Sequence, residues 1–160
     1  MFRFPMMLLA GLLMLTGCSV DVARNDDGSL QVSTIISEES LADEIEHAIA
    51  NPAIQDVAVD LQDGYALVMG TRTRLAGDGS DVMTFRVDLG VLDDRLDVVL
   101  SDVEIGDRPV SGELVENWNA TLSNKLERAG RRNPDATLES VAIQETEVRF
   151  SWRVETPRSR

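Results

Sequence analysis

The chain is 160 residues long, enough for one domain that folds without disulfides or a metal. It has 28 acidic and 15 basic residues, and the resulting net charge of −13 argues strongly against nucleic-acid binding, which depends on neutralising phosphates. The same charge repels anionic lipid headgroups, so the folded part is not expected to lie flat on a bilayer. Cys18 is the only cysteine, which excludes a disulfide framework and a metal site built from several cysteines.

The N-terminal segment has the pattern of a secretory signal peptide. Arg3 and the free amine provide a positive start, and residues 6–15 form an apolar run that leads through small residues to Cys18. Such a run is too short for a membrane-spanning helix, which needs about 20 apolar residues. We therefore expect residues 1–17 to be a signal peptide. One interpretation of this pattern is an ordinary secreted protein in which Cys18 stands by chance.

The end of this segment, Leu15-Thr16-Gly17-Cys18, resembles the lipobox of bacterial lipoproteins. The resemblance implies cleavage after Gly17, a diacylglyceryl thioether on Cys18 and acylation, as with palmitate, of the new amino group. It also implies a domain on the extracytoplasmic side of the cell membrane or the outer membrane. Ser19, as the residue after the cysteine, favours the outer membrane in a host that has one.

Three elements are expected at the start of the mature chain. Residues 18–29 are mostly polar and predict a flexible tether, and residues 30–36 predict a short strand. A helix follows, with Ser37 as its N-cap and its end at Asn51-Pro52. Its apolar stripe is formed by Leu41, Ile45 and Ile49.

Antiparallel strands are predicted between this helix and a second one. Asp63-Gly64 is a strong two-residue hairpin signal, residues 77–80 form a loop, and Asp93-Asp94 forms another turn. After Leu100 the apolar positions change parity, which predicts a β-bulge near Ser101-Asp102.

The second helix and a closing hairpin complete the predicted domain. Ser111 is the expected N-cap of the helix and Gly130 its expected C′ residue. Residues 138–143 and 148–154 predict the last two strands, and residues 156–160 a frayed tail. The apolar stripe of the helix is formed by Leu114, Trp118, Leu122 and Leu126.

Together these elements predict one α+β domain over residues 30–155, a strongly curved antiparallel sheet of about seven strands packed on two amphipathic helices. The order of helix, long antiparallel meander, second helix and final hairpin, with Ile105-Gly106 and Pro109 before the second helix, resembles the LmeA-like envelope proteins. These proteins are related to tubular lipid-binding (TULIP) modules. The resemblance implies a curved sheet wrapped around a long helix and apolar lipid-contacting positions, and it brings no catalytic residues.

The sequence predicts no catalytic residues, no cofactor and no metal site. His47 is the only histidine, which excludes a His–Cys pair and a His-rich metal site, and no Gly-x-Ser-x-Gly motif occurs. Residues 25–28 and 78–81 offer oxygen ligands near turns, but neither segment has the EF-hand spacing. We therefore expect a non-enzymatic protein, since an enzyme would need a cleft holding paired carboxylates.

The first predicted hairpin carries more apolar residues than a half-exposed sheet needs. Its turn pairs Leu61 with Ala66 on one face, which directs Tyr65, Leu67 and Met69 to the other. Either a helix covers this second face, or the face lines a groove for an apolar ligand. The candidate ligand-binding residues are Tyr65, Leu67, Met69, Phe85 and Trp118.

Two functions are consistent with these patterns. The first is a membrane-anchored binder of lipid or another apolar envelope component, which buries acyl chains between the sheet and the helices. The alternative is a structural or protein-interaction lipoprotein without a small-molecule ligand, which binds a protein of the envelope through its acidic face or an exposed edge strand.

Overall fold

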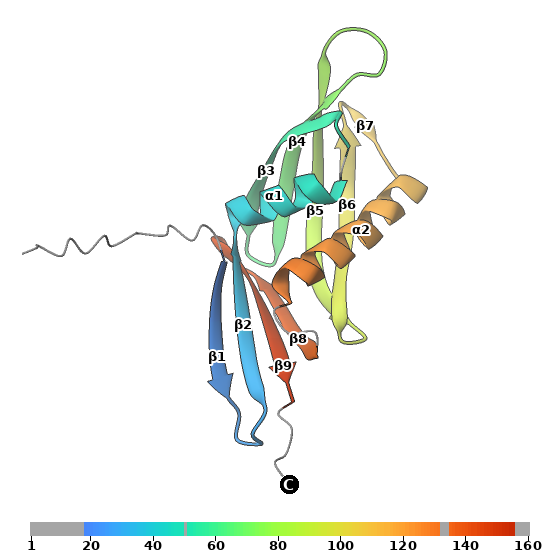
Figure 1. The fold of residues 1–160 in the computed structure, drawn as a ribbon. Helices are drawn as coiled ribbons and strands as arrows, with labels where there is room; N and C mark the ends of the chain where they lie inside the picture. The colour runs from blue at the N-terminus through green and yellow to red at the C-terminus, as the bar shows by residue number, and fades with distance from the viewer. Residues whose placement is uncertain (1–17, 50, 132–134, 156–160) are drawn as a thin grey trace, which may run out of the picture.

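The fold consists of two antiparallel sheets and two helices (Figure 1). The computed structural model describes residues 18–49, 51–131 and 135–155. The predicted signal peptide and the predicted tail lie outside these residues. The α+β class, the two helices and the antiparallel strand pairing are confirmed.

Each sheet has its own strand order. The four-stranded sheet has the order β1-β2-β9-β8, with strands β1 (Cys18–Arg24), β2 (Leu30–Ser37), β8 (Ala136–Ile143) and β9 (Glu147–Val154). The five-stranded sheet has the order β3-β4-β5-β6-β7, with strands β3 (Ile54–Gln62), β4 (Tyr65–Thr73), β5 (Ser80–Leu92), β6 (Arg95–Ile105) and β7 (Arg108–Pro109).

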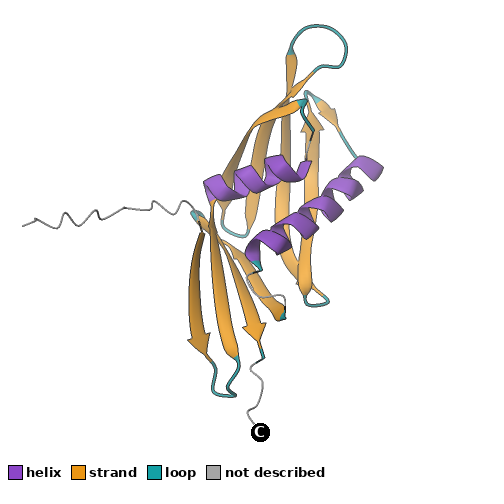
Figure 2. Cartoon of the chain, in the orientation of Figure 1, coloured by secondary structure: helices purple, strands orange, loops and turns teal. Residues whose placement is uncertain are grey.

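The division into two sheets differs from the predicted single sheet of about seven strands. From β2 the chain enters α1 (Glu38–Ile49) and then builds the five-stranded sheet. It returns to the four-stranded sheet only after α2 (Glu113–Gly130), when β9 pairs with the full length of β2. Alternation within a strand does not specify such distant partners, so the sequence pattern did not reveal the division. Both helices lie on the same side of the five-stranded sheet (Figure 2).

Strand β1 lies in the segment that was predicted to be a flexible tether, so that prediction is wrong for these residues. The strand pairs with β2 over its full length, from Cys18 opposite Ile36 to Arg24 opposite Leu30. Residues 19–24 are all exposed. Backbone hydrogen bonds rather than side-chain burial therefore hold this strand, and its composition resembles that of a disordered segment.

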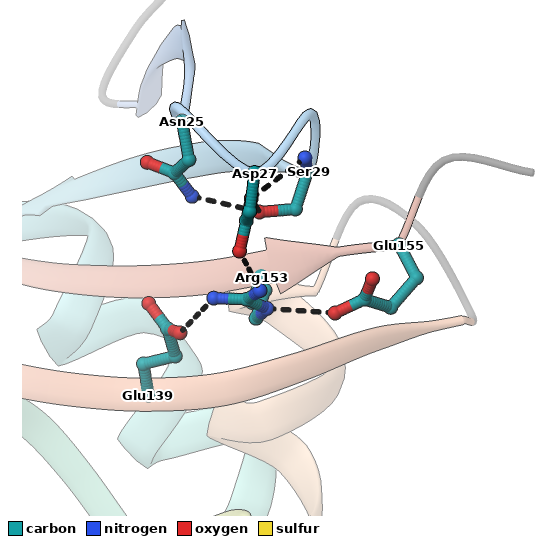
Figure 3. Close-up of polar contacts among 6 residues, drawn as sticks. All are labelled: Asn25, Asp27, Ser29, Glu139, Arg153 and Glu155. Carbon is teal, nitrogen blue, oxygen red and sulfur yellow. Dashed lines mark hydrogen bonds and ion pairs between the residues drawn. The ribbon is translucent and has the colours of Figure 1, made fainter. Parts of the chain in front are cut away.

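The rest of the predicted tether forms an ordered turn between β1 and β2 (Figure 3). Asp27 accepts hydrogen bonds from the backbone N–H of Ser29 at 2.9 Å and from its hydroxyl at 2.6 Å. It also forms an ion pair with Arg153 of β9. The bonds from Ser29, followed by the contact with Arg153, lower the pKa of Asp27 to about 2. Arg153 contacts two further carboxylates, those of Glu139 and Glu155.

Helix α1 begins where its N-cap was predicted. The Ser37 hydroxyl accepts a hydrogen bond from the N–H of Ser40 at 3.3 Å, and Glu38 and Glu39 stand in the first turn, where the helix dipole favours anions. Glu38 also accepts a hydrogen bond from the N–H of Leu61 at the edge of β3. The helix buries Leu41, Ile45 and Ala48.

The turns of the five-stranded sheet follow the predicted positions. Gly64 has a φ of 90°, and Asp93 and Asp94 have φ values of 51° and 61° in the turn between β5 and β6. The predicted bulge occurs at Asp102, whose φ is 52°, and it shifts the pairing of β5 with β6. Aspartate adopts this left-handed region more readily than most residues.

Helix α2 begins one residue later than predicted and ends differently. Gly112 rather than Ser111 occupies the N-cap, with φ 79° and ψ −145°, and no side chain caps the helix there. Gly130 is the last helical residue rather than the C′ residue. A Cβ at Gly130 would lie 3.2 Å from Trp152 and 3.4 Å from Phe150, so the glycine allows the end of α2 to approach β9 closely.

A row of side chains on α2 provides hydrogen-bond acceptors for the backbone N–H groups along the open edge of β6. Glu127, Ser123 and Asn119 accept hydrogen bonds from successive outward N–H groups of the strand. Four helical residues rise about 6.0 Å and two strand residues about 6.6 Å, so the two repeats match closely. We call this set the α2–β6 ladder; its bonds are Leu96 to Glu127 at 3.0 Å, Val98 to Ser123 at 3.2 Å and Leu100 to Asn119 at 2.8 Å.

Removing one acceptor of this ladder is expected to destabilise the fold. Glu127→Ala leaves the N–H of Leu96 without its acceptor and Arg131 without its 2.7 Å ion-pair partner, in a place where the Glu127 side chain is 9% exposed. The expected loss in the free energy of unfolding is about 1–3 kcal/mol, measured by urea denaturation. Asn117→Ala, at an exposed position of the same helix, should change it by less than about 0.5 kcal/mol. Equal losses for both variants would contradict the role of the ladder.

The turn at Asp27 gives a pH-dependent prediction. Because the folded-state pKa is about 2 and the ordinary value is 3.8, its ionised form stabilises the fold above about pH 4, and this contribution is lost as the pH falls toward 2. Asp27→Asn should therefore lower the melting temperature at pH 6, and the difference from the unsubstituted chain should shrink between pH 4 and pH 2. The matched control is Asp26→Asn at the exposed neighbouring carboxylate, which should show no such trend.

Candidate functional site

A groove of about 440 Å³ lies on the face of the five-stranded sheet that is turned away from the helices. The neighbours of its exposed residues along β4, Ala66 and Val68, are buried in the core, which fixes the opposite direction for Leu67 and Met69. We call it the outer groove; it is lined by Asp60, Tyr65, Leu67, Val68, Met69, Thr84, Phe85, Arg86, Asp102 and Glu104.

Strand register brings these residues together from four strands. Leu67 of β4 lies between Asp60 of β3 and Arg86 of β5. In the next row, Met69 is opposite Thr84, which in turn is opposite Glu104 of β6. Apolar side chains therefore occupy the centre of the groove and carboxylates occupy its two walls.

Four of the five predicted ligand-binding residues line the outer groove, and three of these four have exposed or half-buried side chains there. Leu67 is 40% exposed and Met69 53% exposed, and Tyr65 is half-buried beside them. Of the two alternatives for this face, a covering helix and a groove, the structure shows the groove at these positions.

Two of the five predicted residues, Phe85 and Trp118, are buried and belong to the core on the opposite side of the sheet. The side chains of Phe85 and Trp118 are only 2% and 9% exposed, and their ring centroids lie 6.2 Å apart. Phe85 borders the outer groove, but Trp118 does not line it. The apolar stripe of α2 fills the space against the sheet at these residues, where acyl chains were predicted to bind.

Among the described residues, Arg86 is the one cation that lines the outer groove, and Asp88 and Tyr65 already contact it. It forms two hydrogen bonds with Asp88, at 2.7 and 2.6 Å, and its guanidinium lies 4.0 Å above the centre of the Tyr65 ring. The bond to Asp88 raises the pKa of Arg86, with smaller contributions from Tyr65 and Asp102.

Asp60, Asp102 and Glu104 were not among the predicted site residues. A signal for Asp60 was present, because the hairpin register predicted from Asp63-Gly64 already places it beside Leu67. A signal for Asp102 and Glu104 was present as well, because the parity change that predicts the bulge sets them on the face of β6 opposite to Val103 and Ile105.

In the part of the chain that the structure describes, the histidine is not part of a metal-binding group. His47 is exposed on α1, and its Nδ1–H donates to the carbonyl of Asp43 at 2.7 Å. Among the described residues, no group of three or more His, Cys, Asp or Glu side chains is placed to hold a metal ion. Neither helix of the described chain is long and apolar enough to cross a membrane.

Comparison with protein-family models, with curated protein sequences and with solved structures finds no significant match to this chain. The functional argument therefore depends on the residues and the geometry described above.

Proposed function

We propose that this chain is a membrane-anchored extracytoplasmic lipoprotein that binds lipid or another apolar envelope component, without catalysis, in the outer groove. The observation that carries this proposal is the exposure of Leu67 and Met69 beside Tyr65 in a groove of about 440 Å³. This volume lies in the range of ligand pockets, about 300–1,000 Å³. Covering these side chains with an acyl chain removes apolar surface from water, at about 25 cal/mol per Å².

The proposed ligand position differs from the one expected at the outset. Trp118, Leu122 and Leu126 of the α2 stripe are buried between helix and sheet, so we propose the outer face for the acyl chain instead. The resemblance to LmeA-like envelope proteins, which was inferred from the order of the predicted elements, remains part of this proposal.

The anchor is proposed to be a lipid on Cys18, held in the cell membrane or the outer membrane. Cys18 is the first residue of β1 and pairs with Ile36, whose side chain is buried in the core. A lipid attached there would be separated from the folded domain by no spacer. The domain would then stay at the membrane surface, within reach of lipids that leave the bilayer.

The second candidate is a structural or protein-interaction lipoprotein. Strand β1 favours it, because this strand has one neighbour in its sheet and exposes Val20 and Val22 by 45% and 62%. An exposed edge of this kind can pair with an extended segment of an envelope protein. In that case substitutions in the outer groove would leave the function intact.

The anchor is tested by Cys18→Ser. The substitution removes the only thiol, so a cell that is fed radiolabelled palmitate should label the unsubstituted chain and not the variant, which should also keep its signal peptide. Ser19→Ala is the control and should be labelled normally. Labelling of Cys18→Ser would contradict the lipobox assignment.

The groove is tested by Leu67→Asp in a chain that starts at residue 18, which keeps both sheets and both helices. Because Leu67 is 40% exposed, the substitution should change the free energy of unfolding of the protein by less than about 1 kcal/mol. Lipid that co-purifies with the unsubstituted protein, as detected by native mass spectrometry, should be absent from the variant. Val99→Asp is the matched control: it is 46% exposed, lies on β6 and does not line the groove. Retention of lipid by Leu67→Asp would contradict the proposed site.

A further inference from the structure

We propose that the outer groove selects an amphiphile with a positively charged head, whose chain covers Leu67 and Met69 and whose head is held by the carboxylates of the walls. This inference rests on the proposed function and adds the chemical class of the ligand. It follows from the distribution of charge around the groove rather than from the groove's volume.

The walls of the outer groove carry an excess of negative charge. Asp60 stands on the β3 wall, and Asp102 and Glu104 stand on the β6 wall. Asp60 and Glu104 are exposed and form no ion pair with another described residue, and Asp102 has only a longer-range interaction with Arg86. The net charge of −13 on the whole chain adds to the negative electrostatic potential around the groove.

The single cation of the lining does not offset these carboxylates. Arg86 gives two hydrogen bonds to Asp88, and its face is stacked over Tyr65. Its charge is thus already matched by a carboxylate that does not line the groove. A ligand with a carboxylate, sulfate or phosphate head would have to compete with Asp88 for Arg86 and would meet the repulsion of the walls.

The apolar residues and the carboxylates are arranged as an amphiphile requires. The apolar centre lies on β4, and the charged walls lie on the strands to either side of β4 and β5. A chain that follows β4 over Leu67 and Met69 would leave its head beside one wall. An ammonium group there exchanges part of its hydration for a carboxylate at partial exposure, and each such pair contributes modestly.

The selectivity is tested with three probes that share a ten-carbon chain: decyltrimethylammonium, decyl maltoside and decyl sulfate. Each is titrated below its micelle concentration into residues 18–160 carrying Cys18→Ser, and the dissociation constant is measured by calorimetry. We expect the cation to bind roughly tenfold more tightly than the neutral probe and the sulfate to bind most weakly. The difference in dissociation constant between the cationic and the neutral probe should shrink as the salt concentration rises, because salt screens the carboxylates.

Isosteric variants separate the walls from the net charge of the protein. Asp60→Asn combined with Glu104→Gln should reduce the preference for the cation to less than about threefold and leave the neutral probe unaffected. Asp102→Asn should act in the same direction, and asparagine tolerates the φ of 52° at that position. The control is Asp97→Asn, which lies on β6 opposite Gly90, outside the lining of the groove.

The outcomes distinguish this inference from the proposed function. Equal binding of all three probes, abolished by Leu67→Asp, would overturn the charge selectivity and leave the lipid-binding groove in place. Absence of binding by any probe would overturn both. An equal loss of cation binding in Asp97→Asn and in Asp60→Asn with Glu104→Gln would show attraction by net charge only, and would also overturn the inference.

Discussion

The contact between helix α2 and the edge of β6 is the constraint on which the rest of the structure depends. A β-strand at the edge of a sheet exposes N–H groups that must find acceptors. Here Asn119, Ser123 and Glu127 provide them, because four residues of helix and two residues of strand advance by similar distances. The ladder fixes α2 against one side of the five-stranded sheet, where Trp118, Leu122 and Leu126 of its stripe are buried and α1 also packs (Figure 2).

This one-sided closure determines where a ligand can bind. Helix packing covers the inner side of the five-stranded sheet, as the burial of Phe85 and Trp118 shows. The outer side keeps Leu67 and Met69 in water, which is a free-energy cost that covering by an apolar ligand would relieve. Fold and proposed function are thus linked: the same packing that completes the core leaves Leu67 and Met69 as apolar surface in the outer groove.

The sequence predicted the features that arise from local physics. The Asp63-Gly64 turn, the stripe of α1 and the bulge near Asp102 each depend on a few neighbouring residues, and each is present. The prediction was wrong where the structure of a segment depends on residues that are distant in the sequence. β1 has a disordered composition and is ordered by its neighbour β2, and Trp118 could not be assigned to core or groove before the two faces of the sheet were known. The polar row on α2 was not predicted, because its hydrogen-bonding partner, the edge of β6, is distant in the sequence.

The most direct test of this account uses the two methionines of residues 18–160. Met69 lies in the outer groove and Met83 is fully buried on the core side of the same sheet. With ¹³C-labelled methionine methyl groups, addition of a lipid ligand should shift the NMR signal of Met69 and leave that of Met83 nearly unchanged. A shift of Met83 without one of Met69 would place the ligand between sheet and helices and contradict the outer groove as the binding site.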